Sequence, residues 1–144
     1  MKKLRLLALL CMLGVFSTSC KEKQSEWVNF YGYTNQDVVG SYSSSNVVDA
    51  FEGLIEGTYC HICRDAEINI TNRGSKITVE VKSMGTGLNW SGEGNPSLND
   101  NDFLMQLGLD DFLATVYTNT ANQVRLHGYV RKNHVNYYFD VIKN

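Results

Sequence analysis

Hydrophobic and polar positions alternate most clearly between Val124 and Val141, near the end of the chain. A two-residue turn at Lys132-Asn133 would bring two strands together with their apolar residues opposite one another, so that Leu126 faces Phe139. A slip of one residue would exchange the two faces of the hairpin. The pattern therefore predicts a β-hairpin with one dry face on a core and one solvated face.

In this register Arg125 lies directly opposite Asp140 on the solvated face. Exposed ion pairs contribute about 0 to 1 kcal/mol, whereas truncating a buried phenylalanine costs roughly 3 to 5 kcal/mol. Replacing Phe139 by alanine is therefore expected to destabilise the protein much more than replacing Arg125.

A second stretch of alternation predicts another hairpin earlier in the chain. A turn at Arg73-Gly74 would set Ala66, Ile68 and Ile70 opposite Val81, Val79 and Ile77, and glycine suits the positive φ of such turns. In this register Glu67 faces Glu80, a pairing of like charges that the pattern does not explain.

The remaining segments carry weaker signals. We expect a strand at 38–43, and a short helix at 46–57 whose apolar residues fall on one helical face. The polar stretch 83–102 is expected to be a long loop. Alternation then predicts strands at 103–107 and 113–119.

The segment 27–33 is dense in aromatic residues. We interpret it as a first strand or lid packed on the domain, since aromatic side chains mostly serve cores. Contact with a membrane interface is the alternative.

Residues 1–19 have the order of a signal peptide: a basic start, an apolar run and then small residues before Cys20. The run is shorter than the ~20 residues that a membrane span needs. The small residues before Cys20 resemble a bacterial lipobox, although Ser17 stands where leucine is usual. This resemblance implies cleavage before Cys20, lipidation of its thiol and anchoring to a membrane. Secretion with a free Cys20 is the alternative.

Cleavage would leave residues 20–26 as a charged tether of at most roughly 20 Å, followed by one domain at 27–144. Loss of the three basic residues of the signal peptide changes the formal charge from −2 to −5. An acidic chain without a stripe of lysine and arginine is a poor match to nucleic acid, so we expect no nucleic-acid partner.

The chain resembles the lipocalin-like (calycin-like) lipoproteins of Bacteroidetes in four sequence segments, namely 39–43, 65–71, 76–82 and the closing hairpin. The resemblance implies an all-β fold, a meandering antiparallel barrel of about eight strands, whose interior holds one small ligand or is filled by side chains. It also implies an outer-membrane lipoprotein of the cell envelope, either periplasmic or exposed on the surface. It implies no catalytic residues. The segment 46–63, with its predicted helix and two cysteines, departs from the family pattern.

Cys60 and Cys63 are the cysteines that remain beyond the lipidated position, in a compartment that permits disulfides. We interpret them as a disulfide that closes a small loop. A redox motif would place the first cysteine at a helix N-terminus, but the following residues alternate as a strand. A metal site with His61 would still lack a fourth ligand, so no metal is expected.

Other polar clusters give no catalytic signature. Asp110-Asp111 is more typical of a solvated turn than of an acid/base pair, and no serine lies in a nucleophile elbow. Asp100 and Asp102 do not follow the spacing of a calcium loop. We therefore expect a protein that is not an enzyme and has no cofactor.

Two functions remain open. In the first, the mouth of the barrel, with Tyr42, Trp90 and Tyr137, binds a small apolar or glycan ligand. In the second, the barrel is filled, and its outer surface or the aromatic segment 27–33 contacts a partner protein of the envelope. A dry cavity would favour the first function, and a packed interior the second.

Overall fold

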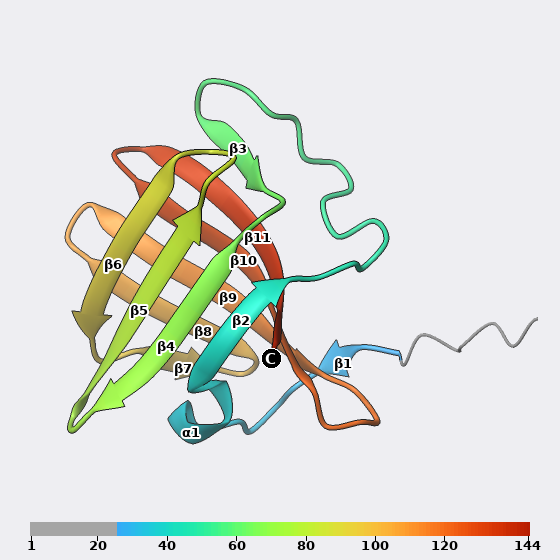
Figure 1. Ribbon diagram of the computed structural model, residues 1–144. Coiled ribbons are helices and arrows are strands. Elements are labelled where there is room, and N and C mark those ends of the chain that lie inside the picture. Colours follow the sequence, from blue (N-terminus) through green and yellow to red (C-terminus); the bar gives the residue numbers. More distant parts are fainter. Residues whose placement is uncertain (1–25) are drawn as a thin grey trace, which may run out of the picture.

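The computed structural model describes residues 26–144, so the predicted signal peptide and Cys20 lie outside the described residues. This part of the chain is almost entirely antiparallel β-structure, with one strongly curled sheet that forms a half-barrel (Figure 1). The elements are β1 (Val28–Asn29), α1 (Asn35–Val38), β2 (Gly40–Ser44), β3 (Cys60–Cys63), β4 (Glu67–Arg73), β5 (Lys76–Ser83), β6 (Leu88–Gly94), β7 (Ser97–Asn99), β8 (Asp102–Leu107), β9 (Asp110–Thr118), β10 (Val124–Lys132) and β11 (Val135–Lys143).

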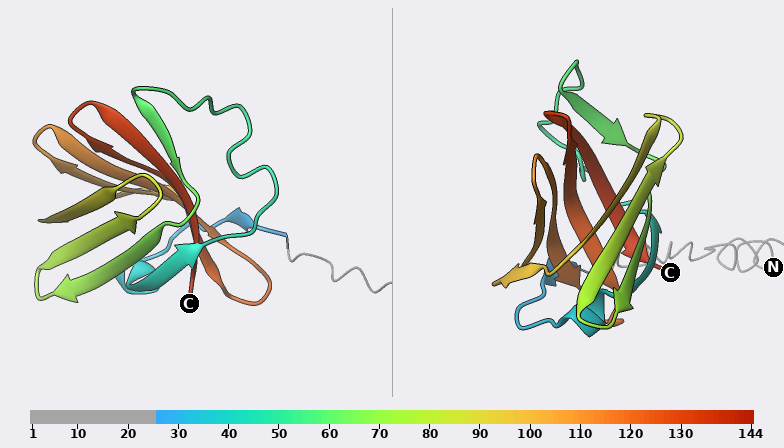
Figure 2. Two further views of the ribbon diagram at one scale, coloured as in Figure 1. Left: turned by 45° about the horizontal axis from the view of Figure 1, so that its top comes forward. Right: turned by 90° about the vertical axis from the view of Figure 1, so that its left-hand side faces the viewer.

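The strands follow the order β6-β5-β4-β2-β11-β10-β9-β8-β7, with β1 paired to β9 and β3 paired to β11. Every pairing is antiparallel except that of β3 with β11, which is parallel. The sheet has 11 strands, where about eight were expected. Figure 2 shows how it curls, so that the β4–β6 side faces the β8–β11 side across the interior.

The closing hairpin forms, but with its turn at Asn133-His134, one residue later than predicted. Both turn residues have positive φ, 50° and 66°, as a type I′ turn requires. Leu126 therefore pairs with Val141, and Phe139 pairs with Gly128. The pairing is offset by two residues from the predicted register, and an even offset keeps the same residues on the core face.

The β4–β5 hairpin has the same kind of offset. Its turn is Gly74-Ser75, with φ +69° at Gly74, and Ile68 pairs with Val81. Glu67 then faces Lys82 instead of Glu80. The like-charge pairing was therefore a product of the wrong register.

Two predicted segments are wrong. Residues 46–57 form a loop of successive turns instead of a helix, with positive φ at Asp49 and Gly53. The stretch 83–102 is not one long loop, because it contains β6 and β7. Leu88 and Trp90 of β6 are buried and alternate with exposed neighbours, as in any strand with one face on a core. The strands predicted at 103–107 and 113–119 are confirmed as β8 and β9.

The aromatic N-terminal segment packs on the barrel as predicted. β1 pairs with the end of β9, Phe30 packs against the core, and Tyr33 is buried. The helix α1 then covers the lower end of the half-barrel in Figure 1, with Val38 completely buried. The hydroxyl of Tyr42 donates a hydrogen bond to the Val38 carbonyl, which ties α1 to β2.

Aromatic rings cross the interior of the half-barrel. Phe112 of β9 stacks on Phe139 of β11 at 5.3 Å between ring centroids, and on Trp90 of β6 at 6.2 Å. Phe103 meets Phe112 edge-on. Strands that are far apart in the sheet order are thus joined through stacked side chains. This part of the interior is packed rather than hollow.

Candidate functional site

The three predicted ligand residues belong to the packed core. Tyr42 and Trp90 are 1% and 5% exposed, and Tyr137 is partly buried against the same core. The indole nitrogen of Trp90 donates to Asp110 at 3.3 Å. Burial raises the pKa of Tyr42 far above its ordinary value, with the nearby charge of Asp37 as a smaller contribution. The three rings therefore pack in or against the core of the half-barrel.

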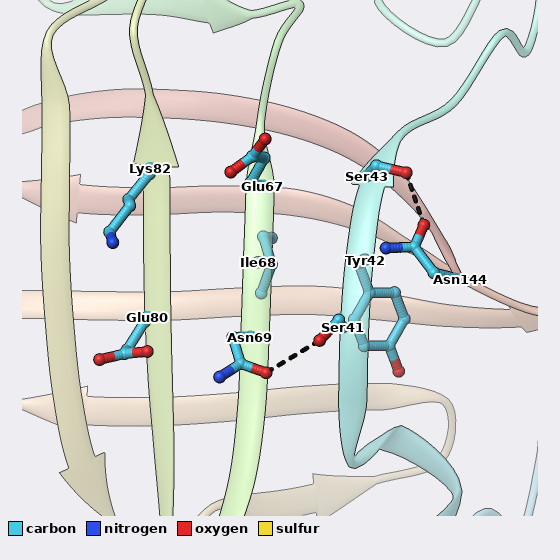
Figure 3. A pocket seen from close by; sticks show the side chains of 9 residues that line it. All are labelled: Ser41, Tyr42, Ser43, Glu67, Ile68, Asn69, Glu80, Lys82 and Asn144. Atoms are coloured by element: carbon cyan, nitrogen blue, oxygen red, sulfur yellow. Dashed lines mark hydrogen bonds between the residues drawn. The ribbon is translucent and has the colours of Figure 1, made fainter.

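A hollow of about 420 Å³ lies instead on the outer face of β2, β4 and β5 (Figure 3). We call it the outer groove. Its lining comprises Ser41, Tyr42, Ser43, Glu67, Ile68, Asn69, Glu80, Lys82 and Asn144. Alternation along each strand explains its chemistry, because the core-facing residues alternate with polar residues that point outward.

The polar side chains of the outer groove divide into two groups. Ser41 donates to Asn69 at 3.1 Å and Ser43 donates to Asn144 at 2.6 Å, so these four side chains hold one another in place. Glu67, Glu80 and Lys82 have no hydrogen bond or ion pair within the described residues. The groove therefore offers uncommitted charged groups beside fixed hydroxyl and amide groups.

Cys60 and Cys63 are free thiols, so the predicted disulfide is not present in this structure. They lie at the two ends of β3, and three residues of extended strand span roughly 10 Å, beyond the Cα separation that a disulfide bridges. Cys63 is completely buried. Burial raises the pKa of its thiol, although hydrogen bonds from Thr86 and Ser83 act in the opposite direction.

A second hollow, of about 570 Å³, lies between β3 and the β5–β6 turn. We call it the upper hollow. Its lining comprises Glu56, His61, Ile62, Arg64, Asp65, Gly85 and Thr86. The carboxylate of Asp65 accepts hydrogen bonds from Ser83 at 2.5 Å and from the Gly85 amide at 2.8 Å, which fixes the β5–β6 turn on one side of the hollow. These hydrogen bonds lower the pKa of Asp65.

Glu56 occupies the other side of the upper hollow. One of its carboxylate oxygens accepts the Ile62 amide hydrogen at 3.1 Å, and both oxygens lie 3.3 Å from a guanidinium nitrogen of Arg64. Neither Glu56 nor Arg64 is predicted from the sequence as a site residue. Glu56 and Arg64 are eight positions apart in the sequence, and they show no pattern until β3 is placed at the edge of the sheet.

A buried charge cluster lies on the opposite face of β10 and β11 from the core. Asp140 is 1% exposed and accepts hydrogen bonds from Arg125, at 2.5 to 3.1 Å, and from Ser45. The Nδ1 atom of His127 lies 2.8 Å from the same carboxylate. Burial alone would raise the pKa of Asp140, but the hydrogen bonds from His127, Arg125 and Ser45 outweigh it and lower that pKa.

The predicted solvated face is therefore wrong at Arg125 and Asp140. Arg125 pairs with Ile142 across the ladder and reaches Asp140 diagonally, under the rings of Tyr117 and Trp27. These rings and the loop after β2 cover this part of the outer face. Asp140 binds both Ser45 and His127, whereas a nucleophilic relay places the histidine between the other two. We interpret the cluster as structural, because it holds the loop after β2 against β10 and β11.

The acidic pairs considered for chemistry are engaged elsewhere. The carboxylate of Asp110 accepts hydrogen bonds from the Trp90 indole and the Asn133 amide. The carboxylate of Asp111 accepts a hydrogen bond from Arg131, and that of Asp102 accepts one from the Thr115 hydroxyl. Within residues 26–144, no group of three or more metal-binding side chains is close enough to hold an ion. In the same range, no helix has the length and apolar character needed to cross a membrane.

Comparison with protein family models, curated proteins and solved structures finds no match for the chain.

Proposed function

We propose that this protein is a non-enzymatic, lipid-anchored envelope protein that binds a partner protein through the outside of a filled half-barrel. The observation that carries this proposal is the aromatic stack from Trp90 through Phe112 to Phe139, which occupies the space where a lipocalin would hold its ligand. The curled antiparallel sheet supports a relationship to the lipocalin-like lipoproteins of Bacteroidetes. Of the two functions considered, a packed interior favours the interaction protein.

One end of the half-barrel is suited to such contacts. The strand directions bring the segment before β3, the β5–β6 turn and the β8–β9 turn to the same end. Tyr59, Met84 and Leu109 lie on these segments, 70%, 95% and 74% exposed. Large apolar side chains exposed together often mark interaction sites.

The chain enters the domain at the opposite end, since β1 pairs with the last residues of β9. A lipidated Cys20 would connect to this end through a tether of at most roughly 20 Å. The membrane then lies near β1, and the end with Tyr59, Met84 and Leu109 faces away from it. That orientation favours a protein partner over the anchoring bilayer as the contact of these side chains.

Site-specific photo-crosslinking in the native envelope tests the proposal. A photoreactive residue at position 84 or 109 should give the same discrete protein adduct, because both positions are on the proposed contact end. Ser75, an exposed turn residue at the other end, is the matched control and should give none. Equal labelling at all three positions, or a small molecule retained inside the purified barrel in native mass spectrometry, would refute the proposal.

A second function is favoured by the outer groove. Its uncommitted Glu67, Glu80 and Lys82, next to fixed hydroxyl and amide groups, are suited to a small ligand rich in hydroxyls, such as a sugar of a glycan. Isothermal titration with a panel of monosaccharides tests this function. A Glu80→Gln variant should weaken binding at least tenfold, whereas Glu93→Gln, outside the groove, should not change it. Equal effects of the two variants would reject the groove as the site.

A further inference from the structure

β3 is an edge strand with part of its edge already occupied. It pairs with β11 along one side, and no other strand of the described chain pairs with it. On the side away from β11, the backbone amide and carbonyl of Cys60 form hydrogen bonds with the backbone of Gly57. The amide of Ile62 donates a hydrogen bond to the Glu56 carboxylate. Exposed strand edges recruit further strands, and natural proteins commonly cover them with local groups.

The Glu56 carboxylate stands where a neighbouring strand would place an acceptor. The pKa of Glu56 is lowered mainly by the hydrogen bond from the Ile62 amide. Burial acts to raise this pKa, whereas Arg64 and His61 lower it further. The site thus combines one backbone donor with a guanidinium, a combination that selects carboxylates. Arg64 and Glu56 remain 64% and 48% exposed, so an incoming group can reach this site from solvent.

The surroundings of Glu56 are suited to an extended chain more than to a small anion. The upper hollow of about 570 Å³ extends beyond the carboxylate, between the free edge of β3 and Gly85-Thr86 of the opposite turn. Ile55 and Met84, 85% and 95% exposed, directly precede Glu56 and Gly85 of this lining in the sequence. An added strand gains affinity from main-chain hydrogen bonds and specificity from side chains that alternate along it.

We propose that the edge of β3 and the upper hollow bind an extended peptide segment of the partner, whose carboxylate replaces Glu56 at the Ile62 amide and Arg64. This inference rests on the proposed function and names its contact. Glu56 is then a ligand supplied by the chain itself, which covers the edge of β3 in the free protein. The carboxylate can come from the C-terminus of the partner or from an acidic side chain, and these sources share the same chemistry.

Binding of labelled peptides to the purified full chain, measured by fluorescence anisotropy, tests this inference. The probes are Thr-Val-Thr-Val with a free C-terminus, the same peptide as an amide, and Thr-Val-Glu-Val as an amide. Acetate serves as the small-anion control. Glu56→Gln removes the negative charge of the internal competitor, and Arg64→Gln removes the guanidinium. Glu93→Gln is the matched control, because Glu93 belongs to an exposed ion pair and lies outside both hollows.

We expect at least one carboxylate peptide to bind Glu56→Gln at least tenfold more tightly than it binds the unaltered chain or Glu93→Gln. Adding Arg64→Gln should remove that gain, and the Ile62 amide resonance should shift on binding. Which of the two acidic probes binds more tightly identifies the source of the carboxylate. The inference is overturned if Glu56→Gln gives no gain, if the neutral amide peptide binds equally well, or if acetate displaces the peptide at equal concentration.

The outcome is separable from that of the proposed function. If the crosslinked adduct at positions 84 and 109 persists unchanged in the Arg64→Gln chain, the partner binds elsewhere, and only the role of the β3 edge is lost. If no specific adduct forms in the unaltered chain, the proposed function fails, whatever the peptides do.

Discussion

At the scale of single residues, burial of Asp140 is the feature that most changes the expected energetics. Its carboxylate is nearly inaccessible, and Arg125, its main cationic partner, is only 9% exposed. Removing one partner of a buried ion pair costs roughly 3 to 5 kcal/mol, because the other charge is left without compensation.

Arg125→Ala is therefore expected to destabilise the protein by about 3 to 5 kcal/mol, similar to the roughly 3 to 5 kcal/mol expected for Phe139→Ala. Denaturant unfolding of the purified protein measures both. Arg64→Ala removes an arginine from an exposed pair and should cost only about 0 to 1 kcal/mol. A loss for Arg125→Ala as small as that of this control would show that the cluster is solvated.

Gly128 has a steric role that sequence alone does not indicate. It lies between Ala114 of β9 and Phe139 of β11, and a Cβ built on it would come within 1.9 Å of the Leu113 carbonyl oxygen. A backbone atom cannot move aside as a flexible side chain does. The strands must separate locally to admit a methyl group.

Gly128→Ala should therefore cost about 1 to 3 kcal/mol or more, as overpacking in a core does. Gly57→Ala is the matched control, since a Cβ there meets nothing within 4 Å. Thermal unfolding of the two variants provides the comparison. Equal melting temperatures would mean that the strands at Gly128 are further apart than described.

The two cysteines should differ in reactivity. The thiolate is the reactive form, and Cys63 is completely buried with a raised pKa, whereas Cys60 is half-buried. Brief treatment of the folded protein with iodoacetamide should alkylate Cys60 first, as detected by peptide mass spectrometry. Unfolded protein, as the control, should react at both. If neither thiol reacts until the protein is reduced, the two cysteines form the disulfide predicted from the sequence.

At the scale of elements, register is set by details finer than apolar alternation. The alternation of β4 and β5 is equally compatible with registers two residues apart, because both place the same side chains on the core. The charges distinguish them: Glu67 faces Lys82 in the structure and Glu80 in the alternative. Oppositely charged cross-strand pairs contribute about 0.2 to 1 kcal/mol.

A charge-reversal cycle on these positions should report the register. Lys82→Glu should destabilise the protein by about 0.2 to 1 kcal/mol, and adding Glu67→Lys should recover that loss by restoring an opposite pair. Chemical denaturation of the two single variants and the double variant gives the coupling energy. A double variant that recovers none of the loss would contradict the pairing of Glu67 with Lys82.

At the scale of the whole molecule, the proposed function assigns one end of the half-barrel to the membrane and the other end to a partner protein. β1 and the start of the domain lie at one end, and Tyr59, Met84 and Leu109 lie at the other. The two edges of the sheet approach through side chains, since Leu107 of β8 packs against Gly92 of β6. Side chains of β6 and β8 thus meet across the open side of the half-barrel, and the free edge of β3 lies beside the upper hollow.

The proposed lipid anchor is testable on its own. Cys20→Ala removes the thiol that lipidation requires, so the protein should leave the membrane fraction on cell fractionation. Cys60→Ala is the matched control and should stay with the membrane. A processed Cys20→Ala chain that still sediments with membranes would show that anchoring does not depend on this residue.

The sequence by itself determined which residues of the two hairpins face the core, because side chains alternate along a strand wherever its partner lies. It also predicted β8, β9 and the packing of the aromatic N-terminal segment. The turn positions and registers predicted for the two hairpins were wrong, since a two-residue offset in the pairing leaves that alternation unchanged.

Tertiary structure decided the environment of each face and the location of the candidate sites. Asp140 is buried because Ser45, Trp27 and Tyr117, from separate parts of the chain, converge over β10 and β11. Trp90, assigned to a polar loop from its neighbours, is a core residue because β6 curls across the interior to Phe112. The outer groove and the upper hollow likewise depend on which strands become neighbours, and such long-range pairing is not encoded in any local pattern of residues.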